Sequence, residues 1–207
     1  MIRPKHLGGL GFRDMEIFNL SLLARQAWRV LCDPDSLSSR ILKAVYFPNF
    51  SLMDADLGSR PSQIWWAILD GRDMLRLGLI RRIGNGKTTH IWTENWLPRP
   101  GMMRPIAPML PNPPQMVSDL ILTATASWNE QLVRSVFLPI DAEAILAIPL
   151  CTRNVEDFWA WSGEQRGSFS VKSAYKIIVQ TKITSENWIE ERDSSSTADS
   201  LRTDWTE

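Results

Sequence analysis

The chain has 207 residues, with 23 basic and 23 acidic side chains, and it contains no apolar run long enough to cross a bilayer. This length allows one ordinary domain or two small ones. Zero net charge excludes a global field that would draw the chain onto nucleic acid, and the basic, turn-rich start lacks the apolar core of a secretion signal.

Three helices are predicted in the first part of the chain. Asp14 can cap a helix to Leu31, whose inner face would carry Leu20, Leu23, Ala24, Ala27, Trp28 and Leu31. A second helix is expected over residues 36–46, paired with the first and with Leu37, Ile41 and Val45 one turn apart. Ser59 and Pro61 would open a third helix, with Ile64, Ile68 and Leu75 as its core stripe and Gly78 as its end.

A change of period after Gly78 predicts a β-hairpin. Residues 79–83 and 88–92 flank Gly84-Asn85-Gly86-Lys87, and Asn-Gly between two such runs is a strong signal for a type I′ turn. Residues 98–116 are rich in proline and predict an extended connector.

The remaining segments predict more helix and a second hairpin. Ser127 to Glu130 has capping-box spacing for a helix through Phe137, and Asp141 would cap another short helix. A hairpin over residues 157–170, turning at 163–167, would precede a last helix from Val171. Residues 184–207 are polar and predict a disordered tail, apart from whatever Trp188 and Trp205 contact.

The predicted fold class is therefore mainly α with two short β-hairpins, an α+β arrangement. The expected segments are 1–97, helical with a hairpin; 98–116, the connector; 117–183, helices with a hairpin-helix unit; and 184–207, the tail. Cys32 and Cys151 are expected to be buried free thiols, because neither has a Cys or His neighbour at zinc-ligand spacing. An intracellular, reducing environment fits this cysteine usage.

Five sequence blocks carry a family resemblance. They are residues 8–14; 33–37 with 42–48; 57–62 with 64–65; 83–86 with 91–92 and 96–98; and 167–175. In this order they resemble the segment after the polymerase core of plant LINE-type (non-long-terminal-repeat) retrotransposon reverse transcriptases. The last block resembles the start of that family's zinc-binding region.

The resemblance implies a non-catalytic fragment of an RNA-directed DNA polymerase polyprotein. Polymerisation uses carboxylates, commonly a Tyr-x-Asp-Asp turn, that hold two metal ions, and this sequence has no Asp-Asp pair. The family's Cys and His zinc ligands would lie after residue 207, and both ends of the resemblance are cut short, as in a partial or degenerate copy. We therefore expect no catalytic residue, metal or cofactor in this chain. We expect the rest of the polyprotein to be its partner.

Basic residues gather around the first predicted hairpin. If they converge they could contact phosphates, with a tryptophan as a stacking surface. The candidate nucleic-acid contacts are Arg72, Arg76, Arg81, Arg82, Lys87 and Trp92. Asp70, Asp73 and Glu94 dilute this charge, so a solvated surface is the competing interpretation. Besides the polyprotein fragment, two functions stay open: a stand-alone nucleic-acid-binding module and a co-opted protein-interaction module.

Overall fold

The computed structural model describes residues 14–99, 101–106, 112–151, 153 and 155–184. The predicted fold class is confirmed, because helices predominate and the strands form two antiparallel pairs. The chain forms two compact units: residues 1–77 with 170–207 make unit 1, and residues 78–169 make unit 2. Residues 78–97 and 117–169 lie in the same unit.

The helices of unit 1 begin where the sequence places capping side chains. They are α1 (Met15–Cys32), α2 (Leu37–Tyr46), the short 3₁₀ helix η2 (Leu52–Asp54), α3 (Gln63–Leu75) and residues 171–184. The Asp14 carboxylate accepts hydrogen bonds from the N–H groups of Glu16 and Ile17 at 3.0 and 3.2 Å. Ser36 and Ser62 cap α2 and α3 in the same way. The predicted start of the third helix at Ser59 and Pro61 was wrong, because the Ser62 hydroxyl accepts from the Trp65 N–H and the helix begins at Gln63.

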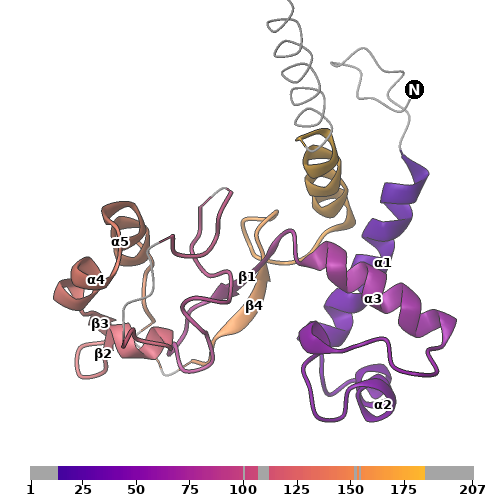
Figure 1. Cartoon of the computed structure of the whole chain (residues 1–207), viewed down its shortest axis with the longest axis horizontal. Helices are drawn as coiled ribbons and strands as arrows, with labels where there is room; N and C mark the ends of the chain where they lie inside the picture. Colours follow the sequence, from indigo (N-terminus) through magenta and orange to yellow (C-terminus); the bar gives the residue numbers. More distant parts are fainter. Residues whose placement is uncertain (1–13, 100, 107–111, 152, 154, 185–207) are drawn as a thin grey trace, which may run out of the picture. The chain divides into compact units, whose positions relative to one another are not determined.

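The core of unit 1 lies mainly between α1 and α3, which cross each other in Figure 1. Ala24 and Ala27 are buried as predicted, and Gly71 brings α3 against the backbone of Leu23 and Ala24. The expected pairing of the first two helices is thus secondary to α1–α3 packing. Trp65 is fully buried and its ring stacks on Tyr46 at 4.6 Å.

Two predicted apolar stripes of unit 1 differ in the structure. Leu37, Ile41 and Val45 of α2 are 72%, 55% and 63% exposed, because α2 turns Ser39 inward. In α3, Ile68 and Leu75 are buried as predicted, but the prediction for Ile64 was wrong, since it is 69% exposed. Helical spacing identifies which residues share a face, but not which face the neighbouring elements cover.

Unit 2 is organised by a pair of strands that lie far apart in sequence. β1 (Leu79–Arg82) pairs antiparallel with β4 (Phe158–Trp161), with Arg81 opposite Trp159 (Figure 1). The predicted strand in residues 79–83 is confirmed, but both predicted hairpins were wrong because β1 and β4 pair with each other. His90 instead bridges to Met116, and the Trp161 N–H donates to the Gly167 carbonyl at 2.7 Å.

Between these strands, unit 2 contains short elements around an apolar core. They are the 3₁₀ helix η3 (Val117–Leu120), β2 (Ile121–Leu122), β3 (Ser127–Trp128), α4 (Glu130–Val136) and α5 (Pro139–Leu146). β2 and β3 pair antiparallel in register Ile121 to Trp128. Their side chains and those of the preceding segment bury the cluster Ile91, Trp96, Leu97, Val117, Leu120, Val133, Phe137, Ala142 and Ile145.

Two predicted helix caps in unit 2 were wrong. Asn129 caps α4, accepting from the Leu132 N–H at 3.2 Å, because Ser127 and Trp128 are drawn into β3. α5 starts earlier than expected, at Pro139, which places Asp141 inside the helix. There Asp141 is buried and pairs with Arg99 at 2.6 Å.

Several predictions fall outside the described residues. They concern residues 8–13 of the first family block, residues 107–111 of the connector, and residues 185–207 of the expected tail; Thr184 itself is helical. The last predicted helix is confirmed, with Ser170 accepting from the Ser173 N–H at 3.1 Å. In the described part of the chain, no helix combines the length and hydropathy needed to span a membrane.

Candidate functional site

The densest polar arrangement in unit 2 surrounds the carboxylate of Asp157, next to the start of β4. One oxygen, Oδ1, accepts from the N–H groups of Gly84 and Gly86 at 2.7 and 2.8 Å. The other, Oδ2, accepts from the Thr88 N–H and hydroxyl at 3.1 and 3.2 Å and from the Thr89 hydroxyl at 2.8 Å. We call residues 84–89 the Asp157 loop, because one side chain binds both halves of it.

Glycine is required in this loop because other backbone approaches it closely. A Cβ atom on Gly84 would lie 2.2 Å from the Val155 carbonyl oxygen. Gly86 has a φ of +71°, and its Cβ would lie 2.5 Å from the Ser118 nitrogen. Because Gly86 alone of the central pair has positive φ, the predicted type I′ turn is wrong. The loop is held between the segments around residues 117 and 155.

The Asp157 carboxylate is stabilised in its charged form. Burial alone would raise the pKa of Asp157, but the hydrogen bonds from Gly84, Thr89, Gly86 and Thr88 outweigh it and hold that pKa below the ordinary 3.8. A charged acceptor strengthens each of these bonds. Asp157 was predicted only as the start of the second hairpin and was not among the candidate site residues; the one available signal was an acidic residue directly before an apolar strand.

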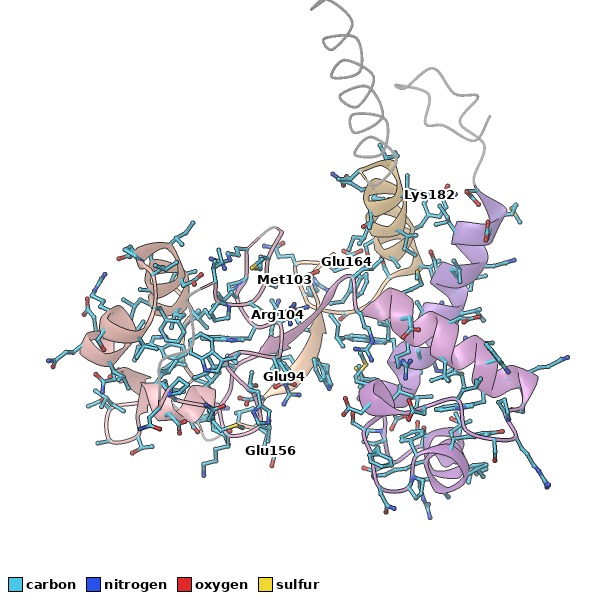
Figure 2. All side chains as sticks on the ribbon, in the orientation of Figure 1. Glu94, Met103, Arg104, Glu156, Glu164 and Lys182 are labelled. Atoms are coloured by element: carbon cyan, nitrogen blue, oxygen red, sulfur yellow. The ribbon has the colours of Figure 1, made fainter. Side chains whose placement is uncertain are left out.

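Arg81 links the Asp157 loop to both strands. Its guanidinium donates to the Thr88 carbonyl and hydroxyl at 3.0 and 2.6 Å, and lies 3.7 Å from the Glu94 carboxylate. The same group sits 4.5 Å from the centre of the Trp159 ring, its partner across the sheet, which is cation–π geometry. Glu94 is labelled in Figure 2 beside this pair of strands. Arg81 is itself buried, so its charge is used inside the protein.

The six candidate nucleic-acid contacts are distributed over both units. In unit 1, Arg72 donates to the Ala55 carbonyl and Arg76 to the Met53 carbonyl. Trp92 is partly buried and packs against the core of unit 2, stacked on Phe137 at 5.3 Å, and its indole N–H donates to the Pro114 carbonyl.

Arg81 is buried, as described above, and the last two candidates, Arg82 and Lys87, are exposed on unit 2. Arg82 donates to the Gln165 carbonyl at 2.8 Å while its residue stays exposed. Lys87 is exposed at the tip of the Asp157 loop. Nucleic-acid contact therefore stays a prediction, now with Arg82 and Lys87 as its most accessible cations among the six.

The cysteine prediction was wrong in one respect: Cys32 and Cys151 are free but exposed. Cys32 nevertheless keeps its sulfur against neighbouring groups, and this burial raises the pKa of its thiol to about 11. Among the described residues, no three His, Cys, Asp or Glu side chains gather in a way that could hold a metal ion.

Comparison with known proteins gives two curated relatives from Arabidopsis thaliana. The chain is 47% identical over 90 residues to an uncharacterized mitochondrial protein, covering 44% of this chain and 58% of that protein. It is 26% identical over 192 residues to a putative ribonuclease H protein, covering 89% of this chain and 30% of that protein. The chain thus spans less than two thirds of either relative. No family model matches the sequence, and no solved structure matches it significantly.

Proposed function

We propose that this chain is a non-catalytic segment of a plant retrotransposon polyprotein, lying between a LINE-type reverse transcriptase core and a ribonuclease H-type region. The observation that carries the proposal is the similarity to a putative ribonuclease H protein, which includes 89% of this chain but only 30% of that protein. The five sequence blocks that resemble LINE-type reverse transcriptases support the same placement.

The acidic groups of unit 2 support a structural role for the segment. Asp157 uses both carboxylate oxygens to hold the Asp157 loop, and Asp141 pairs with Arg99 at 2.6 Å and accepts from the Ile106 N–H at 2.6 Å. A carboxylate that acts as a metal ligand or general base needs a free oxygen directed at a substrate or ion. These two carboxylates are directed at the protein itself.

Two activity assays on the purified full chain test the proposal. One measures DNA synthesis on a primed RNA template, and the other measures cleavage of the RNA strand of an RNA–DNA hybrid, both with Mg²⁺ or Mn²⁺. We expect rates equal to those of a preparation from cells that lack the chain. Turnover that follows the chain through successive purification steps would contradict the proposal.

Nucleic-acid contact is the alternative that the same protein can test. Arg82 and Lys87 are exposed, so phosphate contacts through them would make RNA binding weaken with salt. If the double variant Arg82→Glu with Lys87→Glu loses RNA binding while Arg134→Glu keeps it, the result would favour a nucleic-acid-binding module. Arg134 is the matched control, because it is another exposed arginine of unit 2.

A further inference from the structure

The Asp157 loop, residues 84–89, has the arrangement of an anion-binding site. The N–H groups of Gly84, Gly86 and Thr88 come from alternate residues, and all three donate to the Asp157 carboxylate, at 2.7, 2.8 and 3.1 Å. In a straight strand such N–H groups would lie about 7 Å apart. The backbone of the loop curves so that they converge, and convergent backbone N–H groups form a concavity that binds anions.

Two hydroxyl groups complete the site, and Arg81 orients them. The Thr88 and Thr89 hydroxyls donate to Oδ2 of Asp157 at 3.2 and 2.8 Å. Arg81 donates to the same two hydroxyl oxygens, at 2.6 and 3.4 Å. Because a guanidinium group cannot accept a hydrogen bond, each hydroxyl proton is left for the carboxylate. The positive charge of Arg81 behind these donors favours an anion in front of them.

Contacts that do not involve Asp157 also hold the loop in place. The Gly86 carbonyl accepts from the Ser118 N–H at 2.9 Å, and the Thr89 carbonyl accepts from the Val117 N–H at 3.0 Å. These bonds fix the same stretch of backbone whose donors face the carboxylate. The donors are therefore preorganised by the surrounding protein. We expect the loop to keep its shape when the carboxylate is removed.

The anion in the loop comes from a distant part of the chain and lies near the surface. Asp157 follows Thr89 by 68 residues and leads into β4. Asp157 is 8% exposed, and Thr88, which contacts one of its oxygens, is an exposed residue. A small ion from solvent can therefore reach the site beside Thr88 when the Asp157 side chain is absent.

We infer that residues 84–89 are a binding site for a small carboxylate ion, which the Asp157 side chain fills from within the same chain. Its two oxygens have separate donors, backbone N–H groups at Oδ1 and two hydroxyls with one N–H at Oδ2. The site therefore matches a planar group with two charged oxygens. Without the side chain, the loop binds a free ion of the same shape, such as formate. This inference concerns the loop alone and does not depend on the proposed function.

Thermal unfolding of Asp157→Gly in the full chain tests this inference. Glycine removes Cβ as well, so formate has room at the position of the lost carboxyl group. Formate replaces chloride at constant ionic strength, and circular dichroism follows the helices. We expect the unfolding midpoint to rise with formate, and the ratio of folded to unfolded chain to increase about 11-fold at ten times the dissociation constant. If the variant is unfolded in chloride, the same titration should restore its helical signal.

Two threonine variants show whether formate binds in the loop. Asp157→Gly with Thr89→Val loses one hydroxyl donor at nearly constant volume, and its formate dissociation constant should rise about tenfold. Asp157→Gly with Thr125→Val is the matched control, because Thr125 is an exposed threonine elsewhere in unit 2 and should leave that constant unchanged. The amide signals of residues 84–89 should shift with formate in Asp157→Gly and stay in place in the parent protein.

Three results would overturn the inference. The first is that Asp157→Gly shows the same unfolding midpoint, or the same lack of helical signal, in formate and in chloride. The second is an equal effect of formate on the parent protein, which would show a general action of the salt. The third is an unchanged formate dissociation constant in Asp157→Gly with Thr89→Val, which would place the ion outside the loop.

Discussion

Asp157 sets the path of the backbone between β1 and Ile91. Its two oxygens accept from three backbone N–H groups and two hydroxyls, which would otherwise need partners inside unit 2. In a hairpin these N–H groups would face a neighbouring strand. The carboxylate replaces that strand, so residues 84–89 form a loop.

Replacing Asp157 should therefore destabilise the protein strongly. In Asp157→Asn, an amide group faces donors that need an acceptor, and we expect a loss of about 3 kcal/mol in the free energy of unfolding. Asp119→Asn is the control, because Asp119 is exposed and accepts from the N–H groups of Gln115 and Met116 only. Chemical denaturation measures the free energy of unfolding of both variants. An equal loss of this free energy in the two variants would contradict the role assigned to Asp157.

The same carboxylate should make stability depend on acidity. The pKa of Asp157 is lowered in the folded state from its ordinary 3.8, so its contribution is present above about pH 4 and lost as pH falls through the folded-state value. The pKa of Asp14 is lowered too, chiefly by the hydrogen bond from Ile17, and adds in the same direction. We expect the free energy of unfolding to fall below pH 4 with a smaller slope in Asp157→Asn. Identical slopes would count against this account.

Cys32 should be a slow nucleophile although it is exposed. With its pKa raised from 9.0 to about 11, the thiolate fraction at pH 8 is roughly 100-fold smaller than for an ordinary thiol. In a Cys151→Ser variant, alkylation by iodoacetamide should be slow and should accelerate with pH beyond 9. An alkylation rate equal to that of N-acetylcysteine at pH 8 would show that burial of the sulfur does not raise the pKa of the Cys32 thiol.

At the scale of elements, sequence patterns located most helices and the segment that forms β1, but not the strand pairing. Capping residues such as Asp14 and Ser36 are local signals, so the starts of α1 and α2 could be predicted, whereas α3 is capped at Ser62 and does not start at Ser59 and Pro61. The β1–β4 pair could not be predicted, because the two strands are far apart in sequence and no local rule encodes their pairing. The candidate site was missed for the same reason, apart from Arg81, whose partners were still unknown.

Gly71 is a test of helix packing in unit 1. Alanine normally stabilises a helix interior relative to glycine by about 1 kcal/mol. Here the added Cβ would lie 2.4 Å from the Leu23 backbone, so α1 and α3 must move apart. We expect Gly71→Ala to lower the free energy of unfolding by about 2 kcal/mol, whereas Asp70→Ala, at the exposed neighbouring position, should be nearly neutral. Stabilisation by Gly71→Ala would refute the close packing.

At the scale of the whole molecule, the two units differ in how the chain builds them. The described part of unit 1 combines two separate stretches, residues 14–77 and 170–184, whereas unit 2 is one continuous stretch with its own apolar core. A continuous segment that buries its core internally satisfies the requirements for independent folding.

Unit 2 should fold when expressed alone. We expect residues 78–169 to show a single cooperative thermal transition followed by tryptophan fluorescence. Residues 78–150 are the control, because they keep the apolar cluster but lack β4 and Asp157. Cooperative unfolding of the shorter segment would mean that the β1–β4 pair and the Asp157 loop are not needed for the fold.

The genomic sequence on either side of this coding region shows whether the chain is a segment of a retrotransposon polyprotein, as we propose. We expect an upstream frame that encodes a Tyr-x-Asp-Asp polymerase motif and a downstream frame with a Cys/His cluster and a ribonuclease H-type region, even if stop codons interrupt them. Unrelated flanking sequence, with a transcript bounded at Met1 and Glu207, would contradict a polyprotein origin.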